Sequence, residues 1–367
     1  NTLRNILEPF LSPSSRTHWM GLLVFFTGCF IAYGVSKESL VSVWRRWKSE
    51  TSVHLDVQLL VFNRMFRSLA FGGAMYATWW VSLRVANGYQ GTVGEIETVL
   101  SASTLMVLYS IVLFVVEDAT RFLLHKALHK VPLLWKFHQV HHSATHLTPL
   151  TFFRVHPIES MLYQLRSILS VGMVVGTMYW FGGAELTPVQ ILGVPAFGFV
   201  LNTLFGNFRH SHIFLRFPNW VEHWLISPAQ HQLHHSVEAK HWNRNFGTWL
   251  SIWDKWSGTL LCSSVPPKGF GVADGNHEQG LISALCAPFK SVKQSKMVIV
   301  GSTLFGLLML VGVANAEEVD DGTEGTEGTE EDANDEGTSD SDVKTETVEA
   351  SAQIIVYGDD DQIKEAG

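Results

Sequence analysis

The chain has 367 residues, of which 46% are hydrophobic, with a formal net charge of −8 and a mean hydropathy of +0.14. Its three cysteines are not spaced as a metal or redox pair, which excludes a disulfide framework and a ferredoxin- or rubredoxin-like module from this sequence. Charge is segregated, because residues 317–367 hold 19 acidic residues against Lys344 and Lys364. The rest of the chain is net basic, which suits contact with anionic lipid, and we expect no nucleic-acid partner.

Long apolar stretches alternate with short charged ones. Six of them approach the roughly 20 residues that cross a bilayer as a helix, and they predict five or six spans: residues 19–35, 68–86, 99–116, 161–182, 188–208 and 297–313. If every stretch crosses, the basic clusters at 37–48, 126–136 and 290–296 lie on one side, which the positive-inside rule makes cytoplasmic. We therefore expect an integral, multi-pass membrane protein, of a bacterial inner membrane or of the endoplasmic reticulum.

Histidine is the outlier of the composition, because 14 of the 17 histidines fall between His125 and His241. Residues four apart on a helix share a face, so spaced histidines can reach one ion together. Three boxes have such spacing: His125-Lys-Ala-Leu-His129, His138-Gln-Val-His141-His142 and His231-Gln-Leu-His234-His235. With the predicted spans, all three boxes meet on the cytoplasmic side.

Eight imidazoles are more than one ion needs, since a single zinc takes four ligands. Two ions, each with an open position, are the simplest use of the boxes. Imidazole suits zinc, copper, iron and nickel, so the ligands alone do not name the metal.

Other residues near the boxes are candidates for supporting roles. Asp118 lies two helical turns before His125, where its carboxylate can hold the imidazole tautomer by accepting the second N–H. Further second-sphere donors or additional ligands are His146, His156, His212 and His241.

At this point the motifs resemble those of the fatty acid hydroxylase/sterol desaturase superfamily of membrane di-iron proteins. The resemblance runs from about residue 118 to 259, under half of the chain. It rests on the boxes and on the motifs Arg154-Val-His156-Pro157-Ile-Glu159, Ser227-Pro228-Ala-Gln230, Asn245-Phe-Gly247, Trp253-Asp254 and Gly258-Thr259.

The resemblance implies two non-haem iron ions, O2 as co-substrate, and electrons from NAD(P)H through a separate electron-transfer protein. It implies the eight box histidines as ligands, and His210 matches a further histidine that the family often has between the second and third boxes. The expected reaction is hydroxylation or desaturation of a lipid taken from the bilayer, and fatty acyl, sterol, alkylglycerol and carotenoid substrates all fit. The resemblance implies the di-iron centre itself as the catalytic group, and we assign no separate acid or base.

Two other classes of function compete with this reading. A zinc-dependent membrane hydrolase would need a carboxylate base, but no box contains one, and Glu159 and Glu222 are the nearest candidates. A non-enzymatic metal carrier or transporter would place ligands within the spans, whereas the boxes lie outside them.

The predicted fold is all-α: a multi-pass membrane helical bundle with a cytoplasmic, histidine-rich helical metal-binding cap and a disordered acidic tail. We predict five regions. They are N-terminal membrane helices (1–98), a fatty acid hydroxylase-like di-iron catalytic domain (99–262), a cytoplasmic linker (263–296), a C-terminal membrane segment that is an anchor or is cleaved (297–316), and the tail (317–367).

Overall fold

The computed structural model describes residues 19–36, 40–70, 73–96, 100–182, 196–272, 280–290, 353–356 and 364–366. The chain divides into two units, Asn1–Pro288 with Ser351–Gly367, and Phe289–Ala350. Of the second unit only residues 289 and 290 are described, so the predicted membrane segment at 297–316 lies outside the described residues. The same holds for most of the predicted tail.

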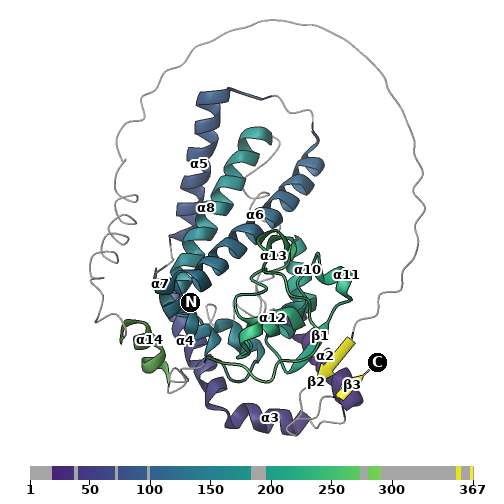
Figure 1. Ribbon diagram of the computed structural model, residues 1–367. Coiled ribbons are helices and arrows are strands. Elements are labelled where there is room, and N and C mark those ends of the chain that lie inside the picture. The colour runs from purple at the N-terminus through teal and green to yellow at the C-terminus, as the bar shows by residue number, and fades with distance from the viewer. Residues whose placement is uncertain are drawn as a thin grey trace, which may run out of the picture. The chain divides into compact units, whose positions relative to one another are not determined.

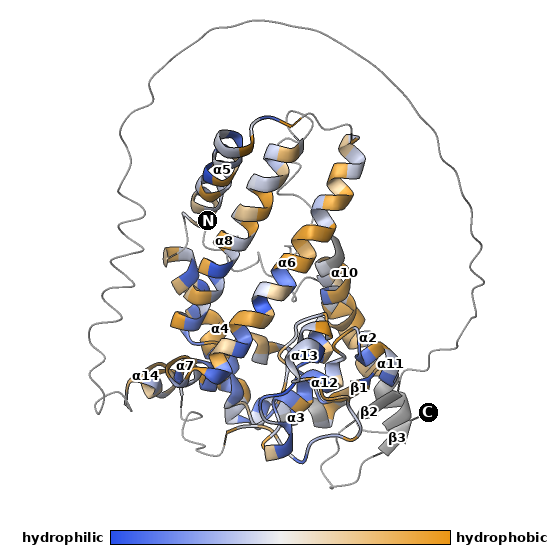
Figure 2. Ribbon diagram, turned by 45° about the horizontal axis from the view of Figure 1, so that its top comes forward, coloured by the Kyte–Doolittle hydropathy of each residue, from blue (hydrophilic) through white to orange (hydrophobic). Residues whose placement is uncertain are grey.

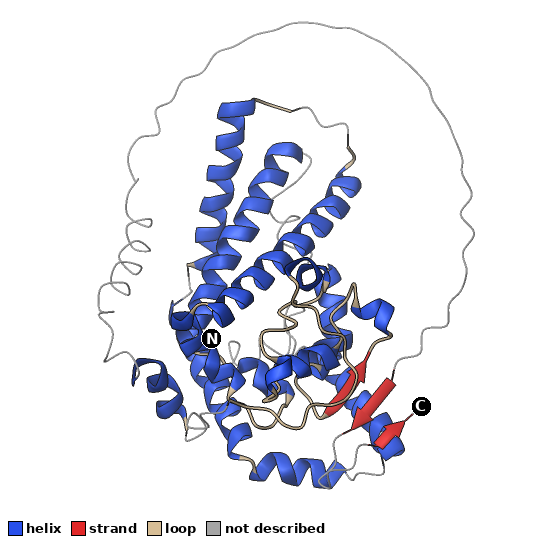
Figure 3. Cartoon of the chain, in the orientation of Figure 1, coloured by secondary structure: helices blue, strands red, loops and turns tan. Residues whose placement is uncertain are grey.

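The described residues are mostly helical (Figure 3), as predicted. The α-helices are α2 (Trp19–Ser36), α3 (Leu40–Ser49), α4 (Thr51–Ala70), α5 (Ala74–Val93), α6 (Ala102–Lys130), α7 (Pro132–His142), α8 (Pro157–Gly182), α10 (Ala196–Phe205), α11 (Asn219–Glu222), α12 (Pro228–His234), α13 (Ile252–Ser257) and α14 (Leu281–Lys290). Short 3-10 helices lie at η1 (Pro149–Phe153), η3 (Gly206–Phe208) and η4 (Ala239–His241).

Two described helices, α6 and α8, are long and apolar enough to cross a membrane. They correspond to the predicted spans at 99–116 and 161–182. Figure 2 shows hydrophobic residues along the part of α6 that is remote from α7 and polar residues toward α7. The first predicted span, residues 19–35, contains a shorter apolar helix at Trp19–Phe30. Of the predicted span at 188–208, the structure describes the short helix α10 and the residues that follow it.

The bounds of the second predicted span were wrong. Residues 68–86 do not form one helix, because α4 ends at Ala70 and α5 begins at Ala74. The sequence Gly72-Gly73 lies at this junction, and glycine is a poor helix former because its backbone loses the most conformational freedom in a helix. The helix that continues beyond the junction runs to Val93, further than the prediction.

Helices α5, α6 and α8 lie side by side (Figure 1), and two glycines let α5 and α8 approach closely. A Cβ atom on Gly172 would meet Val81 Cγ1 at 2.6 Å, and one on Gly176 would overlap the Ser82 carbonyl oxygen. Small residues four apart permit this close contact between the backbones of the two helices.

We expect Gly176→Val to separate α5 from α8 and to lower the thermal unfolding temperature of the protein in detergent. The reason is that the new side chain must displace backbone atoms of α5 rather than the end of a flexible side chain. Gly88→Val is the matched control, because no atom lies within 4 Å of a Cβ at that position of α5. Equal unfolding temperatures for the two variants would contradict this packing.

A small antiparallel sheet adds to the helices. Strand β1 (Ile213–Arg216) pairs with β2 (Gln353–Val356), with Ile213 opposite Val356, and β2 pairs with β3 (Lys364–Ala366). Both β2 and β3 fall within the stretch predicted to be disordered. The run Ile354-Ile355-Val356 explains the difference for β2, because β-branched residues favour strands.

Candidate metal centre

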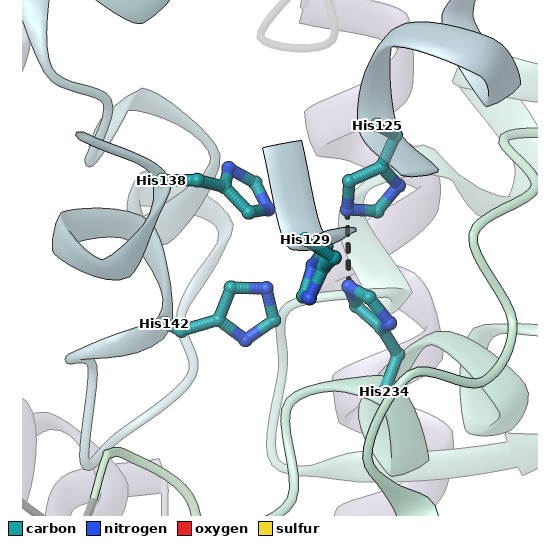
Figure 4. A group of neighbouring side chains, drawn as sticks. All are labelled: His125, His129, His138, His142 and His234. Atoms are coloured by element: carbon teal, nitrogen blue, oxygen red, sulfur yellow. Dashed lines mark hydrogen bonds between the residues drawn. The ribbon is translucent and has the colours of Figure 1, made fainter. Parts of the chain in front are cut away.

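Nine histidines gather between helices α6, α7 and α12, and they form two groups whose ring nitrogens lie within 4.8 Å of one another. The first group, drawn in Figure 4, is His125, His129, His138, His142 and His234. The second group is His141, His210, His231 and His235. The structure thus brings together every box histidine and His210, which follows η3.

The two HxxHH boxes divide between the groups in the same way. In α7, the first and fifth positions, His138 and His142, join the first group, while the fourth, His141, joins the second. At α12 the fourth position, His234, joins the first group, and its box neighbours join the second. Residues four apart stack on one helical face, whereas the residue at the fourth position is rotated toward the neighbouring group.

The third box sits on a helix of seven residues with a defined start. Ser227 and Gln230 form a capping box in which the Ser227 hydroxyl accepts from the Gln230 N–H at 3.0 Å, and the Gln230 side chain accepts from the Ser227 N–H at 2.9 Å. Such reciprocal caps satisfy the donors at a helix start and fix its direction. The cap therefore orients His231 and His234 relative to the other boxes.

Fixed acceptors orient several of the rings. Four imidazoles donate from Nδ1: His125 to the Phe246 carbonyl (2.8 Å), His234 to the Arg244 carbonyl (2.7 Å), His141 to the Arg154 carbonyl (3.2 Å) and His138 to Glu159 Oε1 (2.8 Å). A ring that donates from Nδ1 carries its lone pair on Nε2, which is the arrangement typical of metal-binding histidine.

The distances among the Nε2 atoms fit a cation better than hydrogen bonds. In the second group, the Nε2 atom of His210 lies 3.0 Å from that of His231 and 3.1 Å from that of His235. The Nε2 atoms of His231 and His235 are 3.2 Å apart. A neutral Nε2 is either donor or acceptor, so at least two of the three are alike and face each other without a hydrogen bond. One cation bound by all three lone pairs removes this conflict.

The same test applies to the first group. The Nε2 atoms of His129, His138 and His142 are buried without a hydrogen-bond partner, and those of His125 and His234 lie 3.0 Å apart. Two imidazole nitrogens, each about 2.1 Å from one ion and at right angles to each other, are about 3.0 Å apart. The residues present therefore fit a metal ion in each group.

Burial keeps the histidines neutral. It lowers the pKa of His138 and of His141 to about 3, and it holds the pKa of His142, His231, His234 and His235 well below the usual value. A neutral imidazole is the form that binds a metal, so protons do not compete for these nitrogens near neutral pH.

The metal-free protein should lose stability in acid. Below pH 6.5 the unfolded chain binds protons on these histidines while the folded chain does not, so the free energy of unfolding falls as the pH falls from 6.5 toward 3. Each such histidine contributes about 1.4 kcal/mol per pH unit. Thermal unfolding of the metal-free protein between pH 7 and pH 5 measures the effect, and an unfolding temperature that stays constant over this range would contradict it.

Asp118 takes a role other than the predicted one. Its carboxylate does not hold His125, whose Nδ1 donates to Phe246, but accepts the backbone N–H groups of Trp249 and Leu250 and the Trp253 indole N–H, each at 2.9 Å. The spacing of two helical turns correctly predicts that Asp118 and His125 share a face of α6. It could not predict that the loop containing Trp249 and Leu250 packs against Asp118. Asp118 thus fixes the segment that carries the true partner of His125.

A second carboxylate, Asp254, shapes the same segment. It accepts from the Phe246 N–H at 2.9 Å, the Gly247 N–H at 2.7 Å and the Thr259 hydroxyl at 2.6 Å. A Cβ on Gly247 would lie 2.9 Å from Asp254 Oδ2, so this position has no room for a side chain. The motif residues around 245–259 therefore hold the Phe246 carbonyl against the first histidine group.

Four predicted supporting histidines lie outside both groups. His146 Nδ1 lies 3.4 Å from Glu50 Oε2, and His241 Nδ1 lies 3.8 Å from Glu238 Oε2. Both ring nitrogens of His156 bond to backbone, to the Leu285 carbonyl and the Ile158 N–H, and His212 packs its ring against Trp47. Spacing along the chain placed them near the boxes, but their side chains point to other partners.

Sequence reasoning missed the role of Arg154, which is fully buried. Its guanidinium pairs with Asp56 at 3.1 Å and donates to the Ser52 and Val140 carbonyls, while its own carbonyl accepts from His141. It therefore ties α4 to the end of α7. Arg154 belongs to a motif noted in the sequence, but its partner Asp56 lies 98 residues earlier and belongs to no recognisable motif.

Three histidine boxes on three helices define the class as a helical protein with a histidine-rich candidate metal centre. Residues 110–259 match the family model described as fatty acid hydroxylase, which supports the resemblance of this stretch to the fatty acid hydroxylase/sterol desaturase superfamily. The match lies within the region 99–262 that the sequence assigned to catalysis.

Curated relatives are lipid hydroxylases by their names. The ornithine lipid hydroxylase OlsE of Rhizobium tropici is 25% identical over 189 residues, covering 50% of this chain and 51% of that protein. The cholesterol 25-hydroxylases of Homo sapiens and Rattus norvegicus are 31% and 30% identical, covering 44% and 43% of this chain and 53% and 47% of those proteins. The chain spans about half the length of these relatives, and no solved structure matches it.

Proposed function

We propose that the protein is a membrane-embedded oxygenase that hydroxylates a C–H bond of a lipid, with two non-haem iron ions held by the nine histidines. The observation that carries the proposal is the pair of buried histidine groups, in which neutral rings present Nε2 atoms to two common points. The family of residues 110–259 makes iron the expected metal.

The reaction is balanced by an external supply of electrons. One lipid C–H bond, one O2, two electrons and two protons give one alcohol and one water. Bound iron supplies the activation of O2 that this chemistry needs. In the proposed reaction the electrons come from NAD(P)H through a separate electron-transfer protein. Loss of a second hydrogen in place of hydroxylation would give an alkene.

The chain's own residues bind and orient the metals and exclude water. His141, His142, His231 and their neighbours are at most 8% exposed, apart from the half-buried His129. The carbonyls of Arg244 and Phe246, in one loop, and of Arg154, in another segment, fix the ring tautomers. A dry, preorganised set of ligands favours reaction at the substrate over loss of oxidising equivalents to water.

A long apolar substrate fits the surroundings of this centre. Helices α6 and α8 are apolar enough to lie in a bilayer, and α6 carries His125 and His129 near its far end. We propose a multi-pass protein with its histidines on the cytoplasmic side, where basic loops would dock an acidic electron carrier. The named relatives act on an ornithine lipid and on cholesterol, which favours an acyl lipid or a sterol as substrate here.

The two carboxylates that could act as a base in a zinc-dependent hydrolase have other partners. Glu159 Oε1 accepts from His138, and Glu222 accepts from the Ser227 hydroxyl and the Ser263 N–H, both at 2.7 Å, outside both histidine groups. Neither carboxylate is therefore positioned as a base toward a metal-bound water.

Incorporation of labelled oxygen tests the proposal. The iron-loaded protein in nanodiscs made from lipids of its host would be given oxygen-18 gas and a chemical reductant, and the extracted lipids would be analysed by mass spectrometry. We expect a lipid alcohol that carries the label and is absent with the His142→Ala variant. Labelled product at equal yield from both proteins, or none from an iron-loaded wild type across acyl lipids and sterols, would overturn it.

Glu159 should strengthen metal binding by the first group. Its Oε1 accepts from His138 Nδ1, which makes the imidazole a better donor and holds the ring in place. We expect Glu159→Ala to weaken binding of one metal by about 10- to 100-fold, measured by competition with a chelator. Glu159→Gln, which keeps an acceptor but not the charge, should lie between that variant and the wild type.

A further inference from the structure

Three exposed tryptophans lie on α11, on the turn that follows it and on α13. Trp220 on α11 and Trp224 in the turn that follows it are 57% and 58% exposed, and Trp256 on α13 is 71% exposed. The turn after α11 contacts the start of α13, because the Ser251 N–H donates to the Trp224 carbonyl at 3.0 Å and Lys255 Nζ lies 5.5 Å from the Trp224 ring. These residues form one surface, which we call the tryptophan face.

On both α6 and α8, the boundary between charged and uncharged residues indicates where each helix would leave the hydrocarbon core of a membrane. Residues 102–116 of α6 and 167–182 of α8 contain no charged side chain, and the first charges beyond them, Glu117 and Arg166, pair at 2.9 Å. Both helices therefore leave their apolar stretch at the same height. Fifteen uncharged residues of α6 span about 23 Å, most of a bilayer's hydrocarbon core.

The tryptophan face is fixed at this level. Asp118, next to Glu117, accepts the Trp253 indole N–H and the backbone N–H groups of the two residues that precede Ser251 and α13. Amphipathic tryptophan rings favour the headgroup region of a membrane, and a lysine beside them is attracted to anionic lipid.

We infer that the tryptophan face is a membrane-docking surface, which inserts into the headgroup region of the same bilayer that α6 and α8 cross. The inference rests on the membrane placement in the proposed function. It sets the depth of the metal centre: His125 lies seven residues beyond Asp118, about 10 Å along the helix axis. A lipid carbon therefore reaches the histidines by moving only a short way out of the hydrocarbon core.

Depth-dependent quenching tests the inference without requiring metal or activity. In a background with Cys262 and Cys286 changed to serine, which leaves the buried Cys29, one cysteine at a time would be added by Trp256→Cys, Val107→Cys or Val131→Cys. Each added cysteine would carry an environment-sensitive fluorophore in phosphatidylcholine nanodiscs with nitroxide lipids. Val107 is 60% exposed within the apolar part of α6, and Val131 is 42% exposed beyond its far end.

We expect the label at position 256 to lie about 5–10 Å deep, quenched more by headgroup nitroxide than by acyl-chain nitroxide. The label at 107 should be quenched most by the acyl-chain nitroxide, and the label at 131 by neither. A label at 256 that only aqueous quenchers reach, with the label at 107 in lipid, would overturn the docking surface alone. If the label at 107 also escapes lipid quenching, the membrane placement of α6 fails and the inference falls with it.

Discussion

Replacing one histidine from each group should remove one metal and leave the other. We expect His129→Ala to lose the metal of the first group and His231→Ala to lose that of the second. Each variant should keep about one of two ions, because the altered group has one ligand fewer and a cavity in its place. Lipid oxidation should be lost in both variants, since the proposed reaction needs both ions. Metal analysis of protein purified in detergent measures the outcome.

His146→Ala is the matched control for this experiment. His146 follows the second box by four residues, but its ring faces Glu50 and lies outside both groups. The control variant should keep both ions. Loss of metal from the control, or both ions retained in His129→Ala, would contradict the assignment of ligands.

Removal of Asp56 should be the most destabilising single change in the histidine-bearing part of the protein. Asp56 is fully buried and pairs with the Arg154 guanidinium at 3.1 Å, and it also accepts from the Thr151 hydroxyl at 2.7 Å. Asp56→Ala leaves a buried guanidinium without its counter-charge, which costs about 3–5 kcal/mol of the free energy of unfolding. Thermal or denaturant unfolding in detergent measures the loss.

A double variant separates the charge from the packing. Asp56→Leu with Arg154→Met removes both charges and keeps apolar volume, so it should recover much of the stability that Asp56→Ala loses. The Arg154 carbonyl, which holds His141, remains in the backbone of the double variant. A double variant less stable than Asp56→Ala would show that the hydrogen bonds of Arg154 matter more than its charge.

The convergence of the boxes could be predicted because it depends on spacing. Residues four apart share a helical face, and three boxes of this kind predicted eight of the nine histidines that the structure brings together, while His210 came from the family resemblance. The division of each HxxHH box between two groups could not be predicted, since it depends on how α7 and α12 are rotated about their axes. That rotation is set by long-range contacts such as the one between Arg154 and α4.

The partners that orient the rings could not be found in the sequence either. Phe246 and Arg244 act through backbone carbonyls, which every residue has, so their side chains give no signal. Asp118 was predicted to accept a hydrogen bond from His125, but it accepts from the Trp249 N–H instead. The apolar stretches predicted α6 and α8, whereas the break between α4 and α5 shows that hydropathy alone overlooks a pair of glycines inside an apolar run.

The iron content of the purified protein tests the central claim most directly. Protein produced with iron in the medium and purified in detergent would be analysed for iron, zinc and copper per chain by mass spectrometry. The account predicts about two irons per chain, one for each histidine group. A folded protein that binds no metal, even after reconstitution with ferrous iron under reducing conditions, would contradict it.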